Sequence, residues 1–359
     1  MPLMNIHSLL RDYAVEWSDA PDFVSRLEAS PHRLVVVDEN VWKCHAEGCL
    51  AGMDRNFVEV FAVSEERKNL AGVEALYDLL IGRSAKRNLA LVSIGGGILQ
   101  DLTGFVASTL YRGIPWVFVP TTLLAQADSC IGSKTSLNYK GFKNLLGTFY
   151  PPKAVYLYPA FVLTQKETDY ASGLGEVIKL HMMGGPEKTR ELARLLPLLK
   201  ARDLPALGTA IRNSLEIKYA YFAADEFDTG RRNLLNFGHC FGHALEATSA
   251  FRIPHGQAVV LGMLLANEVA CRRGLLSAAV KERLSRELLR PSLCVRPRHE
   301  EWDSQALVEA LGKDKKRTGS GLALVMMKDD FDLIKVDDLT PDEVRSALRS
   351  LEGDLVERP

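Results

Sequence analysis

The sequence predicts an N-terminal α/β domain with a doubly wound parallel sheet, followed by an all-α C-terminal domain. Up to about residue 160, short apolar segments of strand type alternate with helical patterns, whereas from about residue 165 to 312 the apolar spacing is helical almost throughout. Strands that alternate with helices build βαβ units and hence a parallel sheet. We therefore expect domains at residues 1–160 and 161–359, with a ligand-binding cleft between them.

Each element has its own signal in the sequence. The expected strands of the first domain are apolar segments at 33–37, 57–63, 89–94, 116–120 and 154–158. Helical periodicity covers residues 69–83 and the stretch from the glycines after residue 94 to about Leu110. Residues 322–327 are a candidate for an isolated strand pair. A last helix opens at Thr340-Pro341-Asp342-Glu343, because Thr340 and Glu343 form a capping box and Pro341 takes the first helical position.

Composition and charge exclude several classes of protein. The chain has 359 residues, of which 47% are hydrophobic and 25% are charged, as in a soluble globular protein. A net charge of -1 and an isoelectric point near 6.7 leave no basic footprint for nucleic acid or an anionic membrane. No signal peptide opens at Met1, no apolar run approaches the roughly 20 residues that span a bilayer, and the 6 cysteines are too sparse for a disulfide framework. We expect a cytoplasmic protein that acts on a small anionic molecule.

Small or polar residues follow three of the expected strands. Gly95-Gly96-Gly97 joins a strand to a helix, where glycines let backbone N–H groups approach a pyrophosphate. Asp38, at the end of an earlier strand, is placed to bind an adenosine ribose, and the hydroxyls of Thr121 and Thr122 follow another strand. A bare triple glycine is as typical of a plain strand–helix turn. The prediction of a dinucleotide crevice therefore depends on the three strand ends together.

A polar stretch follows these strand ends and contains Asp128, Lys134, Lys143 and Asn144. Two lysines and an amide near a dinucleotide crevice suit a phosphorylated substrate. The alternative interpretation is a solvated loop.

The densest chemical signal is a group of histidines. His239 and His243 are spaced i,i+4, which puts them on one helix face, and His255 follows, so that 3 of the 8 histidines lie within 17 residues. Glu176 stands three residues before Lys179 and is flanked by apolar residues, so we expect it to be partly buried and to need a cation. Two histidines, one carboxylate and an open position are typical of a catalytic zinc site. Spacing leaves open whether His239 binds the metal with His243 or with His255.

In order along the chain, these segments resemble the dehydroquinate synthase family of sugar-phosphate cyclases. The resemblance covers about residues 33 to 330. It rests on the ordered series Gly95-Gly96-Gly97, Asp101, Gly104-Phe105, Tyr111-Arg112-Gly113, Pro120-Thr121-Thr122-Leu123-Leu124-Ala125, Asp128, Lys134, Lys143-Asn144, Gly175-Glu176, Lys179, Arg232, Asn236-Phe237-Gly238-His239, His255-Gly256 and Asp314-Lys315-Lys316.

The resemblance implies an NAD-binding first domain, a helical second domain and one divalent metal, zinc or cobalt. It assigns the metal to Glu176, His239 and His255, and it turns His243 toward the substrate phosphate. The positions implied to bind NAD+ are Asp38, Glu65, Lys68, Gly95, Gly96, Gly97, Asp101, Thr121, Thr122, Asp128, Lys143 and Thr164.

The implied reaction is a cycle on one substrate, of the kind that serves aromatic amino acid biosynthesis. Bound NAD+ oxidises a ring alcohol polarised by the metal, phosphate leaves by elimination, the hydride returns, and an intramolecular aldol step closes a carbocycle. The implied catalytic residues are Asp128, Lys134, Lys179, Asn236 and His243. The implied substrate contacts are Arg112, Lys134, Asn144, Lys218, Arg232 and His243, with Lys315 or Lys316.

Two of these implications concern substrate choice and assembly. Lys218 and Arg232 match the positions that hold the carboxylate of a seven-carbon keto acid phosphate, and an unpaired cation in a closed site is costly. Arg112 would reach in from a neighbouring subunit, which implies a homodimer.

Three departures from the family pattern indicate a divergent paralogue. Ser133 replaces a glycine, Tyr158 replaces an aspartate, and residues 164–166 replace a Thr-Leu-Pro sequence. A cyclase of specialised metabolism, which acts on an amino substrate or on sedoheptulose phosphate, is therefore an alternative. A metal-dependent alcohol or glycerol dehydrogenase and a non-catalytic NAD-binding protein are further alternatives.

Overall fold

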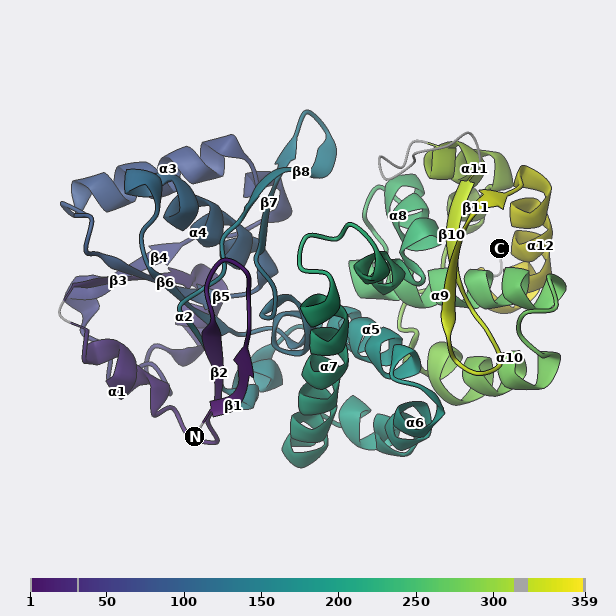
Figure 1. Ribbon diagram of the computed structural model, residues 1–359, viewed down its shortest axis with the longest axis horizontal. Helices are drawn as coiled ribbons and strands as arrows, with labels where there is room; N and C mark the ends of the chain where they lie inside the picture. Colours follow the sequence, from purple (N-terminus) through teal and green to yellow (C-terminus); the bar gives the residue numbers. More distant parts are fainter. Residues whose placement is uncertain (1, 31, 313–321, 358–359) are drawn as a thin grey trace. The chain divides into compact units, whose positions relative to one another are not determined.

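The computed structural model describes residues 2–30, 32–312 and 322–357. The chain divides into two compact units, Met1–Gln165 and Lys166–Pro359. The first is an α/β unit and the second is helical (Figure 1). Among the described helices, none has both the length and the hydropathy that crossing a bilayer requires.

The first unit contains a seven-stranded sheet in the order β1-β2-β9-β6-β5-β3-β4. Neighbouring strands pair in parallel, except that β1 and β2 form an antiparallel hairpin at one edge. All five strands expected from the apolar segments are present. The bounds are β1 (Pro2–Ile6), β2 (Tyr13–Trp17), β3 (Arg33–Asp38), β4 (Val58–Phe61), β5 (Ala90–Gly95), β6 (Trp116–Pro120) and β9 (Ala154–Leu157).

Helices cover both faces of this sheet, as the doubly wound prediction requires (Figure 1). On one face lie α1 (Phe23–Glu28) and α2 (Glu39–His45), and on the other α3 (Leu70–Gly82) and α4 (Gly97–Thr109). Successive side chains of a strand point to opposite faces. In β3, Val35 and Val37 therefore join Phe23 of α1 in one buried cluster. The predicted α/β fold of the first unit is confirmed.

The strand order contains a switch point between β3 and β5. From β3 the chain moves to β4 on one side, and it then returns to β5 on the other side of β3. At such a point the connections after two neighbouring strands leave in opposite directions and open a crevice at the strands' carboxyl ends. Asp38 ends β3 and Gly95 ends β5, and a Cβ built on Gly95 would lie 3.4 Å from that of Asp38.

Residues 134–149, which the sequence left as ligand-binding or solvated loop, form an antiparallel ribbon. Its strands are β7 (Lys134–Tyr139) and β8 (Phe142–Phe149). They are joined by Lys140 and Gly141, whose φ values of 48° and 79° suit a two-residue hairpin turn. The buried side chains of β7 alternate with more exposed ones, a period-2 pattern that a search for helical spacing does not detect.

The described residues of the second unit are helical apart from one hairpin and the connecting loops. Its helices are α5 (Glu167–Met183), α6 (Pro186–Lys200), α7 (Leu204–Ala224), α8 (His239–Thr248), α9 (His255–Arg272), α10 (Ala278–Leu284), α11 (Ser304–Gly312) and α12 (Pro341–Leu355). α9 is buried at every position from Gly256 to Ala270, as expected of a central helix. The hairpin of β10 (Leu322–Met327) and β11 (Leu333–Leu339) lies beside it (Figure 1). The strand pair expected at 322–327 and the capping box of Thr340 and Glu343 are both confirmed.

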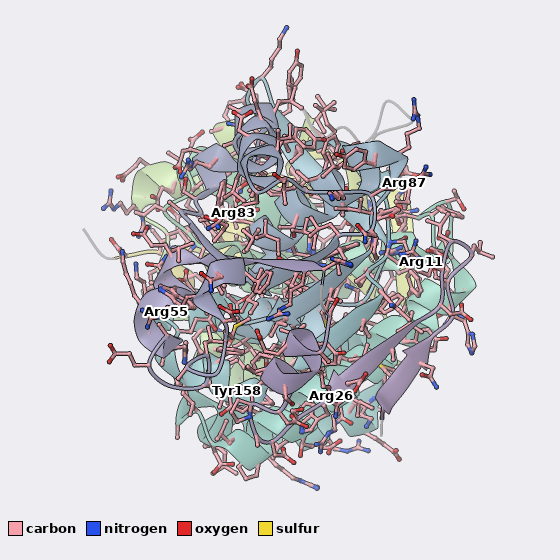
Figure 2. All side chains as sticks on the ribbon, turned by 90° about the vertical axis from the view of Figure 1, so that its left-hand side faces the viewer. Arg11, Arg26, Arg55, Arg83, Arg87 and Tyr158 are labelled. Carbon is pink, nitrogen blue, oxygen red and sulfur yellow. The ribbon has the colours of Figure 1, made fainter. Side chains whose placement is uncertain are left out.

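Several arginines are exposed on the face of the first unit that Figure 2 displays. Arg26 pairs with Glu16, and Arg83 pairs with Glu59. Arg11 and Arg55 lie over the rings of Tyr150 and Trp42, at 5.5 and 5.8 Å from the ring centroids. Each of these four cations therefore has a local acidic or aromatic partner.

His181 of α5 is a buried titratable group with a consequence for stability. Its ring is 0% exposed, and Nδ1 lies 2.8 Å from the carbonyl oxygen of Val177. Burial lowers its pKa to about 4 from the usual value of 6.5. The folded protein therefore holds this imidazole neutral at pH values where the unfolded chain would protonate it.

We expect the free energy of unfolding to fall as the pH falls from 6.5 to about 4. Across this window the imidazole of the unfolded chain becomes protonated, whereas that of the folded protein stays neutral. Stability that is present above pH 6.5 is therefore lost as the pH falls to about 4, by about 3 kcal/mol in total. Urea unfolding of the wild type and of His181→Gln at several pH values measures the loss. The variant should have a flatter profile in this window, and an unchanged slope would contradict the assignment to His181.

Candidate functional site

Close backbone contacts bring the helices of the second unit together around one point. Gly175 on α5 meets Gly256 on α9: a Cβ on Gly175 would lie 2.2 Å from the carbonyl oxygen of Gly256, and one on Gly256 would lie 1.7 Å from that of Ser172. The Ser172 hydroxyl also accepts a hydrogen bond of 2.9 Å from the Gly256 N–H. Glu176 and His255, each next to one of these glycines, are thereby placed side by side.

A second pair of glycines brings α8 against α9. Gly238, immediately before α8, has a φ of +78°, and a Cβ there would lie 2.6 Å from the carbonyl oxygen of Val259. A Cβ on Gly262 would lie 1.9 Å from the carbonyl oxygen of Gly238. His239 starts α8 beside this contact, so that it joins Glu176 and His255.

Three donor atoms converge where these helices meet. Oε1 of Glu176 lies 3.5 Å from Nε2 of His239 and 3.4 Å from Nε2 of His255. The ligand atoms of these three residues all lie within 4.8 Å of one another, and the Glu176 side chain is only 3% exposed. One carboxylate oxygen and two imidazole nitrogens form a typical three-ligand set for a catalytic divalent metal.

A hydrogen-bond acceptor at Nδ1 fixes the ring orientation of both His239 and His255. Nδ1 of His239 lies 3.2 Å from the carbonyl oxygen of Phe237, and Nδ1 of His255 lies 3.2 Å from Oε2 of Glu246. An acceptor at Nδ1 holds the N–H there, which leaves the lone pair on Nε2. Both lone pairs then face Glu176.

The charged groups around Glu176, His239 and His255 favour the binding of one additional cation. Lys179 Nζ lies 2.5 Å from the other oxygen of Glu176. Burial, with nearby Lys179, holds the pKa of His239 well below its usual value. Burial also works to lower the pKa of His255, but hydrogen bonds to Glu176 and Glu246 outweigh it and raise the pKa to about 10. A proton on His255 therefore occupies a position that a metal ion fills by displacing it.

Beside this centre lies a pocket with an empty volume of about 520 Å³, open to solvent. His243 is exposed, with its ring 5.4 Å from that of His239. The pocket is lined by Asn233, Asn236, His239, Cys240, His243, Leu311, Ala323, Leu324, Val325 and Lys335. A molecule in this pocket would contact His243 and Asn236 and lie next to the three converging donors.

Two buried cations stand on α7 and on the short helix η6 (Arg231–Asn236). Lys218 is 6% exposed and Arg232 is 7% exposed. The Arg232 guanidinium donates to the Glu226 carbonyl oxygen and lies 5.3 Å from the centre of the Phe222 ring. Both side chains are therefore candidates for charge-assisted hydrogen bonds to an anionic ligand.

In the first unit, the residues expected to bind a dinucleotide lie at the carboxyl ends of three neighbouring strands. Asp38 accepts a 2.7 Å hydrogen bond from Asn40 N–H and caps α2, and burial raises its pKa. A Cβ on Gly96 would lie 2.9 Å from Cγ2 of Thr122, so only glycine leaves this turn open. Gly97 begins α4 there, where helix N–H groups point outward and attract an anion. Thr121 is buried and bonds Gly95 through its N–H at 3.0 Å.

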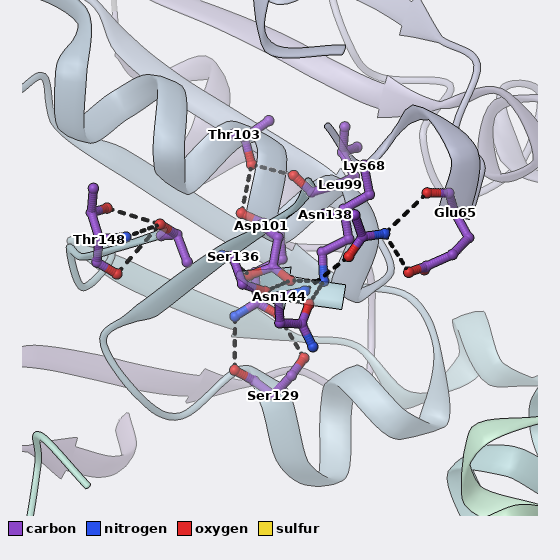
Figure 3. Close-up of polar contacts among 12 residues, drawn as sticks. Glu65, Lys68, Leu99, Asp101, Thr103, Ser129, Ser136, Asn138, Asn144 and Thr148 are labelled. Atoms are coloured by element: carbon purple, nitrogen blue, oxygen red, sulfur yellow. Dashed lines mark hydrogen bonds and ion pairs between the residues drawn. The ribbon is translucent and has the colours of Figure 1, made fainter. Parts of the chain in front are cut away.

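A polar network joins the β7–β8 ribbon to α4 and to the loop before α3 (Figure 3). Lys68 Nζ lies 2.5 Å from Oδ2 of Asp101 and donates to Oδ1 of Asn144 at 2.7 Å. Asp101 accepts from the Ser136 N–H and hydroxyl at 2.8 and 2.9 Å. Lys68 and Asp101 are therefore bonded to each other, and together they anchor the ribbon.

The same network orients the Asn144 side chain. An ammonium group only donates, so the atom of Asn144 that faces Lys68 must be its oxygen. Asn144 has a φ of 50°, and its N–H donates to Asn138 at 3.0 Å. Asn138 in turn donates to Oε1 of Glu65 at 2.8 Å. Among the described residues Nδ2 of Asn144 has no partner, and it is exposed as a donor.

Residues 59–172 match the family model "3-dehydroquinate synthase N-terminal", and residues 173–317 match "3-dehydroquinate synthase C-terminal". A 3-dehydroquinate synthase of Streptococcus pneumoniae (strain ATCC 700669 / Spain 23F-1) is 37% identical over 303 residues, which are 83% of this chain and 84% of that one. The chain belongs to the 3-dehydroquinate synthase family.

Two solved structures extend this likeness to other cyclases. ValA, the 2-epi-5-epi-valiolone synthase from Streptomyces hygroscopicus subsp. jinggangensis 5008, solved with NAD+ and Zn2+ bound, matches with a TM-score of 0.84 and 27% identity over 98% of this chain and 99% of that one. A 2-deoxy-scyllo-inosose synthase, complexed with carbaglucose-6-phosphate, NAD+ and Co2+, shares the fold with a TM-score of 0.80 at 20% identity, over 97% and 99%. The fold is thus that of the sugar-phosphate cyclases.

Other positions that the family pattern selects lie as follows. Asp128 stands in a short π-helical turn, Lys134 and Lys143 are exposed on the ribbon, and Arg112 is exposed. The hydroxyl of Thr164 lies 2.8 Å from Nε2 of His45. Lys315 and Lys316 lie outside the described residues.

Two of the three departures from the dehydroquinate synthase family pattern have structural roles. Tyr158 packs on Phe161 with ring centroids 5.3 Å apart. Oε1 of Gln165 accepts a 3.0 Å hydrogen bond from the Leu123 N–H. Ser133 is 1% exposed, beside Lys134. Two of the three are thus accommodated by packing or by a hydrogen bond within the first unit.

Sequence reasoning missed Glu246, the partner of His255. It stands seven residues after His239 on α8 and is 4% exposed. Its signal is a carboxylate on the same helix face as His239 and His243, between apolar residues.

Proposed function

We propose that this protein is a 3-dehydroquinate synthase, an NAD+- and metal-dependent cyclase that converts a seven-carbon keto acid phosphate into a carbocycle with loss of phosphate. The observation that carries the proposal is the convergence of Glu176, His239 and His255, with both histidines held by acceptors at Nδ1. Family membership at 37% identity supports it.

The residues present fit both cofactors. Glu176, His239 and His255 would hold one divalent metal, Zn2+ or Co2+, because one carboxylate oxygen and two imidazole nitrogens lie within 4.8 Å of one another there. Asp38, Gly95, Gly96, Gly97, Thr121 and Thr122 would hold the dinucleotide, because a side chain on Gly96 would close the turn. When bound, the two groups supply hydride transfer and Lewis-acid polarisation of a ring hydroxyl.

The chain's own residues would bind and orient the substrate phosphate. Lys134 and His243 supply donors, and the outward amide of Asn144 adds another that Lys68 fixes in orientation. Lys315 or Lys316 is a further proposed contact. Phosphate held in this way leaves by elimination, with one of its own oxygens as the base. The protein would then contribute mainly by positioning the substrate and not by transferring a proton.

The proposed substrate is acidic because of the two buried cations. Lys218 and Arg232 are each less than a tenth exposed. Both stand at the positions that the family pattern assigns to the substrate carboxylate, and a carboxylate would form stronger, charge-assisted hydrogen bonds with them than the hydroxyl of a neutral sugar. Asn236 lines the adjacent pocket and would accompany them, while Asp128 and Lys179 are proposed to orient the reacting groups.

We also propose a cytoplasmic homodimer in which Arg112 contributes to the partner's site. Arg112 is exposed, as a residue that reaches the site of a partner subunit must be. Sedimentation equilibrium tests the dimer, and a monomer at micromolar concentration would remove this part of the proposal.

A second candidate is a cyclase that acts on a sugar phosphate without a carboxylate. The likeness to ValA over 98% of the chain favours it, as do the substitutions at Ser133 and Tyr158. In that case Lys218 and Arg232 would contact other groups.

A phosphate-release assay across heptulosonate, heptulose and hexose phosphates tests the proposal. A dehydroquinate synthase should release phosphate only from the carboxylated substrate and without net NADH formation. Release from heptulose phosphate alone would favour the second candidate. NADH production from a simple polyol without phosphate release would identify a dehydrogenase instead.

Arg232→Ala should weaken turnover of a carboxylated substrate by about thirtyfold or more in kcat/KM, since loss of one partner of a buried charge pair costs about 2–5 kcal/mol. Turnover of a neutral analogue should change far less. The matched control is Arg231→Ala, because Arg231 is exposed and lies over the Tyr221 ring. Equal losses on both substrates would show that Arg232 does not recognise the carboxylate.

A further inference from the structure

Glu246 occupies an unusual position behind His255. It is 4% exposed, and its Oε2 lies 3.2 Å from Nδ1 of the His255 ring, whose other nitrogen faces Glu176. Among the described residues, Glu176, His239 and His255 form one metal-competent group, and His243, Glu246 and His255 form another. Both groups need the same imidazole.

One imidazole cannot serve both groups at once. A neutral ring has one N–H and one lone pair, so it binds a metal through one nitrogen only while the other carries the proton. Nε2 points to Glu176, which is 3% exposed, and Nδ1 points to Glu246. When the Glu246 carboxylate accepts the Nδ1 hydrogen, the lone pair of the His255 ring is on Nε2. That lone pair is then available to a metal between Glu176 and His239.

The main chain of Glu246 also helps to position His255. The Glu246 carbonyl oxygen accepts a 2.8 Å hydrogen bond from the Phe251 N–H and one of 3.2 Å from the Ser249 hydroxyl. Ala250 and Phe251 have φ values of 46° and 63°, so the turn that leads to His255 is held in a conformation that costs energy. The Glu246 main chain thus holds the turn before α9, and its side chain holds the tautomer of His255.

We infer that Glu246 is a positioning residue for the metal, which acts through His255 and makes the Glu176 group the single site occupied. The inference rests on the metal centre of the proposed function. A hydrogen-bonded carboxylate behind a histidine ligand orients the ring and increases its basicity, and removal of such a partner costs about 10–100-fold in metal affinity. The protein should bind one zinc per chain at this centre.

Zinc affinity of the full-length chain, measured by competition with a chromophoric chelator, tests this inference. Glu246→Ala should weaken binding by about 10–100-fold. Glu246→Gln keeps an oxygen acceptor and should lose less. The matched control is Glu268→Gln, because Glu268 is also a buried carboxylate, 6% exposed, but pairs with Arg272 and Lys281 near the far end of α9. It should retain wild-type affinity.

A spectroscopic readout separates positioning from general destabilisation. In the Co2+-substituted protein the Nδ1–H protons of His239 and His255 should give two paramagnetically shifted signals that disappear in D2O. Glu246→Ala should lose the His255 signal by rapid exchange and keep that of His239. Retention of both signals, unchanged zinc affinity, or two zinc ions at this centre in the wild type would overturn the inference.

Failure of this inference and of the proposed reaction can be distinguished. A wild type that binds one zinc but releases no phosphate would contradict the cyclase proposal and leave the role of Glu246 intact. If the wild type releases phosphate and Glu246→Ala binds zinc with wild-type affinity, the role of Glu246 is contradicted and the cyclase proposal stands.

Discussion

Glu176→Gln and His255→Ala should each abolish turnover, mainly because the metal is lost. Oε1 of Glu176 is the atom that both imidazole nitrogens face, at 3.5 and 3.4 Å, and His255 supplies one of those nitrogens. A Lewis-acid metal contributes several kcal/mol to such a reaction, so its loss should lower the rate about a thousandfold or more. Metal content per chain after dialysis, with phosphate release on the same samples, measures both effects.

The two variants differ in their effect on the buried Lys179. Glu176→Gln removes the partner of the buried Lys179 and should also reduce stability, whereas His255→Ala leaves that pair in place. His299→Ala is the matched control, since His299 is 80% exposed in the same unit and pairs with Glu352. Full activity in either variant after chelation and dialysis would show that the metal ligands are wrongly assigned.

Gly256→Ala should have the largest effect on folding. A Cβ there would lie 1.7 Å from the Ser172 carbonyl oxygen, a backbone atom that cannot rotate away. Helix α5 or α9 must move, and overpacking of this kind costs about 3 kcal/mol or more. Because the same movement separates Glu176 from His255, zinc affinity should fall together with the free energy of unfolding.

Gly353→Ala provides the matched control for that substitution. Gly353 lies in α12 of the same unit and has open space at its Cβ position. Alanine there should stabilise the helix by about 0.5–1 kcal/mol. Denaturant unfolding and zinc titration of both variants measure the contrast, and a Gly256→Ala protein with wild-type zinc affinity would contradict the close-contact argument.

The fold could be predicted largely from local pattern. The five parallel strands appeared as apolar segments and the helical half as continuous 3.6-residue spacing, because both signals lie within short windows. The β7–β8 ribbon was not predicted, since its alternation covers few residues and its turn uses Lys140-Gly141, a weak hairpin signal.

The candidate site could be predicted only in part. Spacing placed His239 and His243 on one face but could not choose between His243 and His255, because that choice depends on how α8 and α9 cross. The resemblance to the cyclase family selected His255, which remains a prediction until metal is measured. Glu246 was not predicted as a site residue, because a glutamate on an amphipathic helix is ordinarily a surface residue.

The glycine contacts around Glu176, His239 and His255 imply that the smallest residues there tolerate substitution least. The helices that carry Glu176, His239 and His255 touch through main-chain atoms at Gly175, Gly238, Gly256 and Gly262, so their spacing does not depend on the bulk of interlocking side chains. In a saturation mutagenesis experiment, many large apolar residues of α5 and α9 should accept substitutes of similar volume. The smallest residues should accept none. The geometry of the centre is thus encoded mainly where the chain carries no side chain at all.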